Sequence, residues 1–233
     1  MIRPYSFDAK KTKNEIVTWI RNYFRKNGSD CNAVIGMSGG KDSTIVAALC
    51  CEALGKDRVF GVIMPNDTMK DNDIAVEICE YLDIDYMDIN IGKAYDSLTN
   101  ELAANDIELS SNAATNLPAR LRMATLFMVA QSVNGRVANT CNFSEDYVGW
   151  ATLFGDGAGQ FSPLGKLTVT EVKQIGYELG LPKKFIEKIP ADGLTDKSDE
   201  DNFGFTYQFL DRYIRTGDFG NDTATAARID KMH

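Results

Sequence analysis

Apolar residues recur at two spacings along the chain, and the two spacings alternate. Apolar side chains three or four positions apart predict helices at residues 14–24, 43–54, 71–82, 119–133, 168–179 and 203–214. Short apolar runs that end at glycine, proline or polar residues predict strands at residues 31–37, 58–64, 85–91 and 135–141. Strands that alternate with helices form right-handed β-α-β units, so the pattern predicts an α/β fold, a Rossmann-like parallel sheet with helices on both faces.

Length and charge limit what such a fold can do. The chain has 233 residues and a formal charge of −8, and no long linker or repeat divides it. We therefore expect one domain over residues 1–233. The acidic balance disfavours a nucleic-acid partner, and no apolar run approaches the roughly 20 residues of a membrane span. Five cysteines without a Cys-x-x-Cys pair are typical of buried thiols in a reducing compartment, so we expect a cytoplasmic protein.

Histidine content narrows the chemistry. The only histidine is His233, the last residue. A Ser-His-Asp type of triad or a His-rich metal site needs histidines inside the fold. The sequence therefore nearly excludes both.

The clearest chemical motif is an octapeptide between the first predicted strand and the helix that follows it. Ligands bind at the carboxyl ends of parallel strands, and a glycine pair lets the backbone present several N–H groups to one anion. The following helix adds the partial positive charge of its N-terminus. The motif therefore predicts a phosphate-binding loop made of Gly36, Met37, Ser38, Gly39, Gly40, Lys41, Asp42 and Ser43.

This loop differs from the Walker A motif. Ile35 stands where Walker A has its first glycine, and Asp42 follows the lysine. An aspartate so close to phosphates would repel them unless a cation lies between, so Asp42 predicts a magnesium ion. The alternative is a tight strand-to-helix turn whose serines have no ligand.

The hexapeptide from Ser38 to Ser43 resembles the signature of the PP-loop (N-type) ATP pyrophosphatases. The resemblance implies an adenine nucleotide alpha hydrolase-like fold. It also implies cleavage of ATP between its α and β phosphates, with transfer of AMP to a substrate oxygen. The superfamily includes NAD synthetases, other amidoligases and tRNA thiolases.

Three later segments resemble the NAD synthetases in particular. Residues 116–123 are similar to the N-x-x-A-R-x-R-M stretch of that family, and Glu145 follows Arg120 at the family's spacing of 25 positions. Residues 149–156 and 198–207 resemble two further family segments. The likeness runs from about residue 13 to the C-terminus. It includes no glutaminase domain, which matches the short, ammonia-dependent form.

The resemblance implies a reaction that converts deamido-NAD, ATP and ammonia into NAD, AMP and pyrophosphate. A carboxylate is a poor electrophile, so AMP transfer to the nicotinate carboxylate first gives an acyl adenylate that ammonia attacks. Such chemistry needs charge neutralisation more than a histidine base. The absence of internal histidines is therefore compatible with it.

The resemblance also implies a role for each candidate residue. Asp42 and Glu145 would hold Mg²⁺ and, with Asp156, are the catalytic candidates. Asp156 would lie near the nicotinyl end of the substrate and orient or deprotonate ammonium. Thr140 would contact ATP from the end of its strand. The residues expected to contact deamido-NAD are Arg120, Asn116 and His233.

The predicted helix at residues 119–133 is apolar over most of its circumference. Such a helix is buried, either in a large core or in a subunit interface. We interpret it as the interface of a homodimer.

The chain departs from the family at three positions. Leu153 stands where many members carry a lysine, and Gln160 stands where they carry an aspartate, both near the dinucleotide substrate. A lysine that usually touches the ATP phosphates falls at Val169. Lys41 and Lys166 are the two candidates to supply the missing charge.

Two other functions remain open at this level. Another PP-loop enzyme, a tRNA thiolase or a different amidoligase, shares the first motif, but thiolases commonly need a reactive cysteine or Cys-x-x-Cys pairs and a basic surface. A nucleotide sensor that has lost its chemistry would keep the loop. The presence of both Asp42 and Glu145 argues against the sensor, although each residue alone would also suit a solvated surface.

Overall fold

A parallel sheet forms the centre of the structure, a computed structural model that describes residues 2–67, 72–187 and 198–233. Its strands lie in the order β3-β2-β1-β4, and every pairing is parallel. Val34 in the central strand pairs with Phe60 on one side and Val137 on the other. The strands are β1 (Asn32–Gly36), β2 (Val59–Ile63), β3 (Asp85–Asp88) and β4 (Gly135–Val137). The predicted α/β fold is confirmed.

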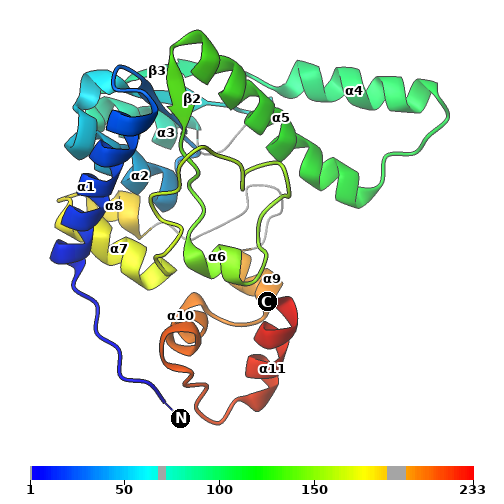
Figure 1. The fold of residues 1–233 in the computed structure, drawn as a ribbon. Helices are drawn as coiled ribbons and strands as arrows, with labels where there is room; N and C mark the ends of the chain where they lie inside the picture. Colours follow the sequence, from blue (N-terminus) through cyan, green and yellow to red (C-terminus); the bar gives the residue numbers. More distant parts are fainter. Residues whose placement is uncertain (1, 68–71, 188–197) are drawn as a thin grey trace.

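One face of the sheet carries the larger core (Figure 1). Ile20, Phe24, Ile45 and Leu49 are fully buried there against Ile35 of β1. Each such side chain stabilises the fold by about 1.5–3 kcal/mol through burial. The helices on this face are α1 (Ala9–Asn27), α2 (Lys41–Leu54), α3 (Asn72–Leu82), α7 (Val169–Glu178) and α8 (Lys183–Ile186), and a short 3₁₀ turn η1 (Lys56–Arg58) leads into β2. Residue 71, where the third predicted helix begins, lies outside the described residues.

The opposite face is covered by α5 (Ser111–Ser132). Val129 and Ala130 of this helix are buried in one cluster with Val34 and Val137 of the sheet. The sequence predicted only residues 119–133 as a helix, because the residues before them are mostly polar. The structure begins the helix at Ser111, with Ser110 as its N-cap, whose hydroxyl accepts a hydrogen bond from the N–H group of Ala113.

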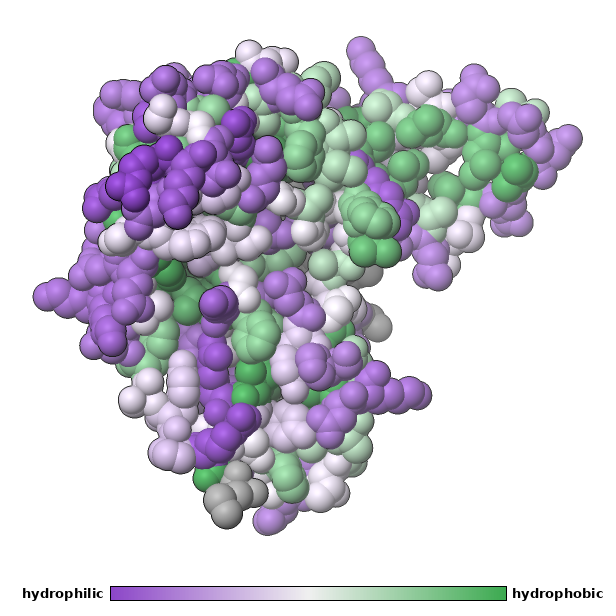
Figure 2. All heavy atoms as spheres, viewed as in Figure 1, coloured by the Kyte–Doolittle hydropathy of each residue, from purple (hydrophilic) through white to green (hydrophobic). Residues whose placement is uncertain are grey.

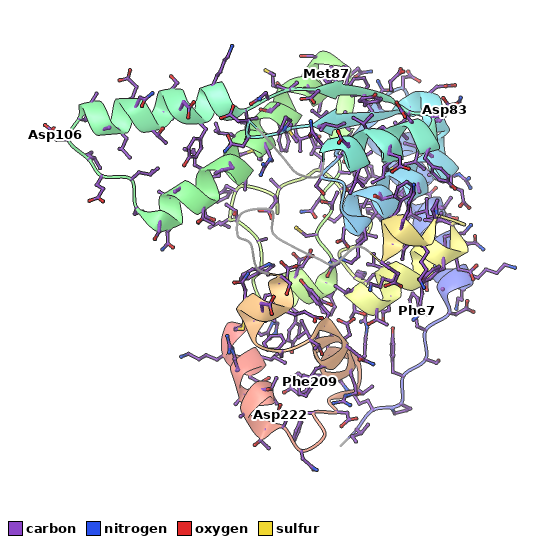
Figure 3. The ribbon with its side chains drawn as sticks, turned by 180° about the vertical axis from the view of Figure 1, so that it is seen from behind. Phe7, Asp83, Met87, Asp106, Phe209 and Asp222 are labelled. Atoms are coloured by element: carbon purple, nitrogen blue, oxygen red, sulfur yellow. The ribbon has the colours of Figure 1, made fainter. Side chains whose placement is uncertain are left out.

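An arm extends from the body of the molecule. It consists of α4 (Gly92–Ala104) and the first turns of α5, and Asp106 marks its tip (Figures 1 and 3). Hydrophobic side chains gather along this arm in Figure 2. Leu98 and Ile107 are each at least half exposed there, and Met128 near the C-terminal end of α5 is exposed as well. The sequence did not predict α4, a helix in which only Gly92 is buried.

A smaller helical unit holds the C-terminal part of the chain, where Phe209 and Asp222 are labelled in Figure 3. Its helices are α6 (Phe143–Tyr147), α9 (Asp199–Phe203), α10 (Tyr207–Thr216) and α11 (Thr223–Met232). The single helix predicted at residues 203–214 is wrong. Gly204 adopts a left-handed conformation with φ of 75°, which ends α9 before α10 begins.

The five cysteines are all unpaired, and four of them are buried. Burial raises the pKa of Cys51 to about 11 and the pKa of Cys79 to about 12. It also raises the pKa of the Cys50 and Cys141 thiols. These four thiols therefore stay protonated, and poorly nucleophilic, at neutral pH.

Among the described helices, none combines the length and the apolar character that crossing a membrane requires.

Candidate active site

The predicted phosphate loop joins the carboxyl end of β1 to the N-terminus of α2. Gly39 turns the chain with φ of 73°, a conformation that favours glycine. The hydroxyls of Ser38 and Ser43 lie 3.3 Å apart, and Ser38 Oγ accepts a hydrogen bond from the Gly40 N–H. Gly40 is the N-cap of α2 and supplies no capping side chain. The loop therefore places hydroxyls and an uncapped helix N-terminus at the edge of the sheet where parallel strands bind ligands.

Lys41 and Asp42, in the last part of the loop, form a close ion pair. The Lys41 ammonium lies 2.6 Å from Asp42 Oδ2, and its side chain is only 2% exposed. Burial lowers the pKa of Lys41, but the facing carboxylates of Asp42, Glu145 and Asp199 outweigh burial and hold it above its ordinary value. Lys41 is therefore a buried cation surrounded by acids.

Glu145 is presented by α6, a helix of only five residues. Asn142 caps this helix: its side-chain oxygen accepts hydrogen bonds from the N–H groups of Ser144 and Glu145, and Glu145 Oε2 accepts one from the Asn142 N–H. Ser144 Oγ donates to the buried Asp211 at 2.5 Å and so ties α6 to α10. This reciprocal capping box is what holds Glu145 in place.

The loop and α6 bring Asp42 and Glu145 into one electrostatic cluster. Burial and then the Asp42 carboxylate raise the pKa of Glu145 to about 8, and Lys41 opposes the shift. Asp199, 4% exposed, joins the cluster from α9 and accepts hydrogen bonds from Trp150 Nε1 and the Tyr207 hydroxyl. The carboxylates of Asp42, Glu145 and Asp199 thus all interact electrostatically with the buried Lys41.

The donor set fits a magnesium ion. Mg²⁺ is usually bound by one or two carboxylates together with substrate phosphates and water, not by a cage made only of protein. Asp42 and Glu145 supply such a pair next to the phosphate loop. Within residues 2–67, 72–187 and 198–233 no group of three or more His, Cys, Asp or Glu could hold a metal by itself. The arrangement therefore suits an ion that arrives with a nucleotide.

The candidates for the second substrate lie together where α5 meets the loop of residues 149–160. Arg120 is exposed and its Nε donates to the Leu153 carbonyl at 3.3 Å. Asn116 Oδ1 accepts a hydrogen bond from Thr152 Oγ1 at 2.7 Å, and Asp156 Oδ1 accepts one from the Thr152 N–H. Thr152 is thus the residue that holds these side chains together, and sequence reasoning missed it.

The remaining candidates lie on either side of α6. Thr140 is half-buried and lies two residues before the cap of this helix. His233 stacks on Tyr147 of α6 with ring centroids 4.0 Å apart. Val169, where the family lysine is absent, is buried among aromatic side chains, and Lys166 is exposed. Gln160 pairs with β4 through its backbone and its side chain, which accepts from the Val137 N–H.

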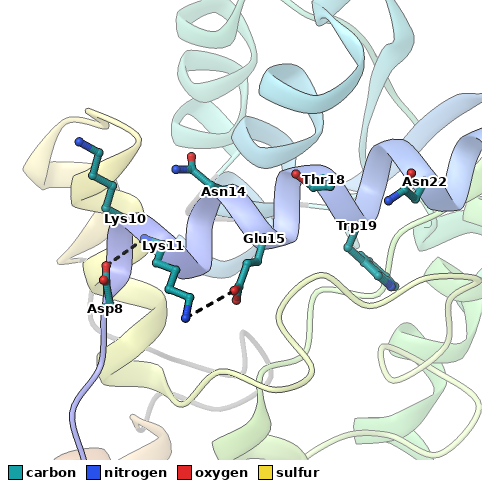
Figure 4. Close-up of a pocket in the computed structure, with 8 residues that line it drawn as sticks. All are labelled: Asp8, Lys10, Lys11, Asn14, Glu15, Thr18, Trp19 and Asn22. Atoms are coloured by element: carbon teal, nitrogen blue, oxygen red, sulfur yellow. Dashed lines mark hydrogen bonds and ion pairs between the residues drawn. The ribbon is translucent and has the colours of Figure 1, made fainter.

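A shallow hollow along α1 is unrelated to these residues (Figure 4). It is lined by polar side chains and Trp19, and it contains the exposed Lys11–Glu15 ion pair. No candidate site residue lines it. This hollow therefore does not mark the site formed by the phosphate loop and the carboxylates.

Fold and loop define an α/β nucleotide-using enzyme whose phosphate loop follows its first strand, and comparisons with known proteins identify its family. The family model for NAD synthase matches residues 12–232. The chain is 37% identical to the NH3-dependent NAD(+) synthetase of Pyrococcus furiosus over 201 residues, which are 86% of this chain and 77% of that protein. The chain belongs to the NAD synthase family.

Solved structures agree with this assignment. The structure matches the NMN synthetase of Francisella tularensis with a TM-score of 0.88 and 33% identity, covering 98% of this chain and 94% of that one. It matches the NAD+ synthetase of Burkholderia pseudomallei with a TM-score of 0.80 and 26% identity, covering 97% and 88%. The predicted family, the ligase class and the ammonia-dependent NAD synthetase function are confirmed. The tRNA thiolase alternative is not favoured.

Proposed function

We propose that this chain amidates deamido-NAD with ammonia, and that ATP and Mg²⁺ are used at the site formed by the phosphate loop and α6. The observation that carries the proposal is the meeting of Asp42 and Glu145 beside that loop, since the two residues are about a hundred positions apart in sequence. An adenylating ligase needs this combination of phosphate donors and carboxylates.

The nucleotide half of the proposal assigns ATP to the loop. Backbone N–H groups at Gly39 and Gly40, the Ser38 and Ser43 hydroxyls and the N-terminus of α2 bind the phosphates. Thr140 contacts the nucleotide from the chain that follows β4. Lys41 supplies positive charge from within the acidic cluster, and the exposure of Lys166 favours Lys41 for the charge missing at Val169.

Magnesium has one role in the proposal. Asp42 and Glu145 would hold the ion, and the bound ion would supply positive charge to neutralise the phosphates. The protein itself keeps both carboxylates in reach of the loop and excludes water around Lys41.

The second half of the proposal places the pyridine nucleotide beside α5. The exposed Arg120 guanidinium binds its phosphates, and Asn116 holds the loop through Thr152. Asp156 orients ammonium toward the activated carboxyl carbon. His233 closes on the site from α11, where it already contacts α6.

A second candidate substrate is the mononucleotide acid, whose amidation gives NMN. The specific observation is the structural match: the TM-score is 0.88 to the Francisella tularensis NMN synthetase, against 0.80 and 0.76 to the NAD synthetases of Burkholderia pseudomallei and Campylobacter jejuni. The departures at Leu153 and Gln160 fall on the same side of the site. The adenylation and ammonia steps are the same for both substrates.

One experiment tests both candidates. The purified protein is incubated with ATP, Mg²⁺ and ammonium, and with either deamido-NAD or nicotinate mononucleotide, and kcat/KM is measured for each. NAD with AMP and pyrophosphate as the better reaction supports the first candidate. A higher kcat/KM for NMN formation selects the second. ADP with phosphate, or no turnover from pH 7 to 9, contradicts both.

The homodimer is also a proposal. Within the predicted interface at residues 119–133, Val129 and Ala130 pack on the sheet and Met128 is exposed. Met128 and the exposed Leu98 and Ile107 of the arm support a second copy of the chain as the partner. Sedimentation at micromolar concentration tests it. A monomer at every concentration would contradict it.

A further inference from the structure

Asn142 donates a hydrogen bond to each of the two proposed magnesium ligands. It is fully buried, with 0% exposure. Its N–H donates to Glu145 Oε2 at 3.1 Å, and its side-chain Nδ2 donates to Asp42 Oδ1 at 3.3 Å. Asp42 belongs to the phosphate loop and Glu145 to α6, so these bonds join two elements that the chain itself does not connect locally.

The orientation of the Asn142 amide is determined by its neighbours. A primary amide has one acceptor end and one donor end. The N–H groups of Ser144 and Glu145 point at its oxygen from 3.0 and 3.2 Å, which leaves the NH₂ group to face Asp42. The other Asp42 oxygen is held by Lys41 at 2.6 Å. Both oxygens of Asp42 therefore have a fixed partner.

The helix that carries Glu145 cannot hold its position alone. A helix of five residues has few internal hydrogen bonds, so its direction depends on its cap and on tertiary contacts. The Asn142 amide provides the cap and the link to Asp42 at once. We propose that Asn142 is a positioning residue that fixes Glu145 relative to Asp42 and thereby sets the Mg²⁺ affinity of the pair. This inference rests on the proposed function.

The capping role and the linking role can be separated by substitution. Serine is as good an N-cap as asparagine, because its hydroxyl also accepts from the backbone N–H groups. It has no NH₂ group to reach Asp42. Asn142→Ser therefore keeps α6 and removes the link, and Asn142→Ala removes both.

The matched control is Asn139→Ser in the same segment. Asn139 is also buried and also caps the chain locally, since its Oδ1 accepts from the Cys141 N–H and its Nδ2 donates to the Gly157 carbonyl. It contacts neither Asp42 nor Glu145 in these bonds. Both substitutions thus remove one buried amide, but only Asn142→Ser removes the hydrogen bond to Asp42.

The test measures metal dependence in two ways. Turnover is followed against Mg²⁺ concentration at saturating ATP, and Mn²⁺ binding is followed by electron paramagnetic resonance in the presence of α,β-methylene ATP, which is not cleaved. Asn142→Ser is expected to raise the half-saturating Mg²⁺ and the Mn²⁺ dissociation constant by about tenfold. Its kcat at saturating Mg²⁺ and its melting temperature stay near those of the wild-type protein, and Asn139→Ser shows no shift in metal dependence.

Three results would overturn the inference. The first is an unchanged metal dependence in Asn142→Ser, and the second is an equal loss of rate at every Mg²⁺ concentration with a lower melting temperature, which indicates a structural role. The third is an equal metal shift in Asn139→Ser. A wild-type protein that forms no AMP and pyrophosphate would instead contradict the proposed function.

Discussion

The nucleotide side and the pyridine side of the site are built differently. The loop from Gly36 to Ser43 is anchored in the sheet and leads into a buried lysine, whereas the loop of residues 149–160 carries Leu153 and Phe154 with exposures of 71% and 73%. Phe154 also adopts a φ of 56°, which costs a non-glycine residue energy. The difference shows that the nucleotide side is supported by the sheet, whereas the pyridine side lies on an exposed loop.

The largest effect on activity is expected from a substitution on the nucleotide side of the site. Asp42→Asn removes a charge from the proposed magnesium pair with almost no change in shape. We expect kcat to fall by about 10³-fold, a magnitude usual for the loss of one charge-stabilising group. The rate of AMP formation measures it, and circular dichroism checks that the fold is retained. Activity within tenfold of wild type would show that Asp42 is not a metal ligand.

Lys41 and Lys166 provide a matched pair for the next test. Lys41→Met keeps the side-chain volume but removes the buried cation, so we expect the KM for ATP to rise by about tenfold. Lys166→Met changes an exposed side chain and should alter the KM less than twofold. Equal effects from the two substitutions would remove the assignment of the missing charge to Lys41.

A substitution of Arg120 tests whether the nucleotide side and the pyridine side of the site bind their substrates independently. Arg120→Ala is expected to raise the KM for the pyridine nucleotide by about tenfold and to leave the KM for ATP unchanged, because its guanidinium lies on the exposed side. Steady-state kinetics with each substrate varied in turn measures the split. A parallel rise of both values would indicate that the halves act as one unit.

The smallest expected effect is on stability against pH. The pKa of Glu145 is raised from 4.5 to about 8, so the folded state holds this proton more tightly than the unfolded chain. The resulting stability is complete below pH 4.5 and is lost as the pH rises to about 8. Without metal, the free energy of unfolding should fall between pH 6 and pH 8 by an amount on the order of 1 kcal/mol.

Glu145→Gln is the control for this titration. The amide does not ionise, so urea denaturation of the variant should show a smaller loss over the same pH range. Saturating Mg²⁺ with ATP should also reduce the loss in the wild-type protein. An identical pH dependence in wild type and variant would mean that another group titrates.

The sequence predicted those parts of the molecule whose structure is determined by residues close together in the chain. The alternation of strands and helices follows from hydrophobic spacing, and the phosphate loop follows from a few adjacent residues between β1 and α2. The family resemblance added Glu145, Arg120 and Asp156. Their roles stay predictions, although the structure brings Glu145 close to Asp42.

The parts that the sequence missed depend on contacts between distant residues. Nothing around Asn142 indicates that its amide reaches Asp42, a hundred positions earlier. The link from Asn116 to Thr152 is equally non-local. The α4 helix lies on the arm and buries only Gly92, so it adds little to the core of the molecule. The spacing of apolar residues indicates which side of a helix or strand is buried in the core. It gives no information on polar contacts between distant residues, or on a helix that lies outside the core.

The protonated, buried cysteines make the protein convenient for site-specific labelling. The pKa of each of four thiols is raised by burial, and Cys31 is buried with its Sγ donating to Asn134. A cysteine introduced at the exposed position of Leu153 would therefore react with a maleimide dye at neutral pH well before the native thiols. A single fluorophore there would report directly on the exposed loop of residues 149–160.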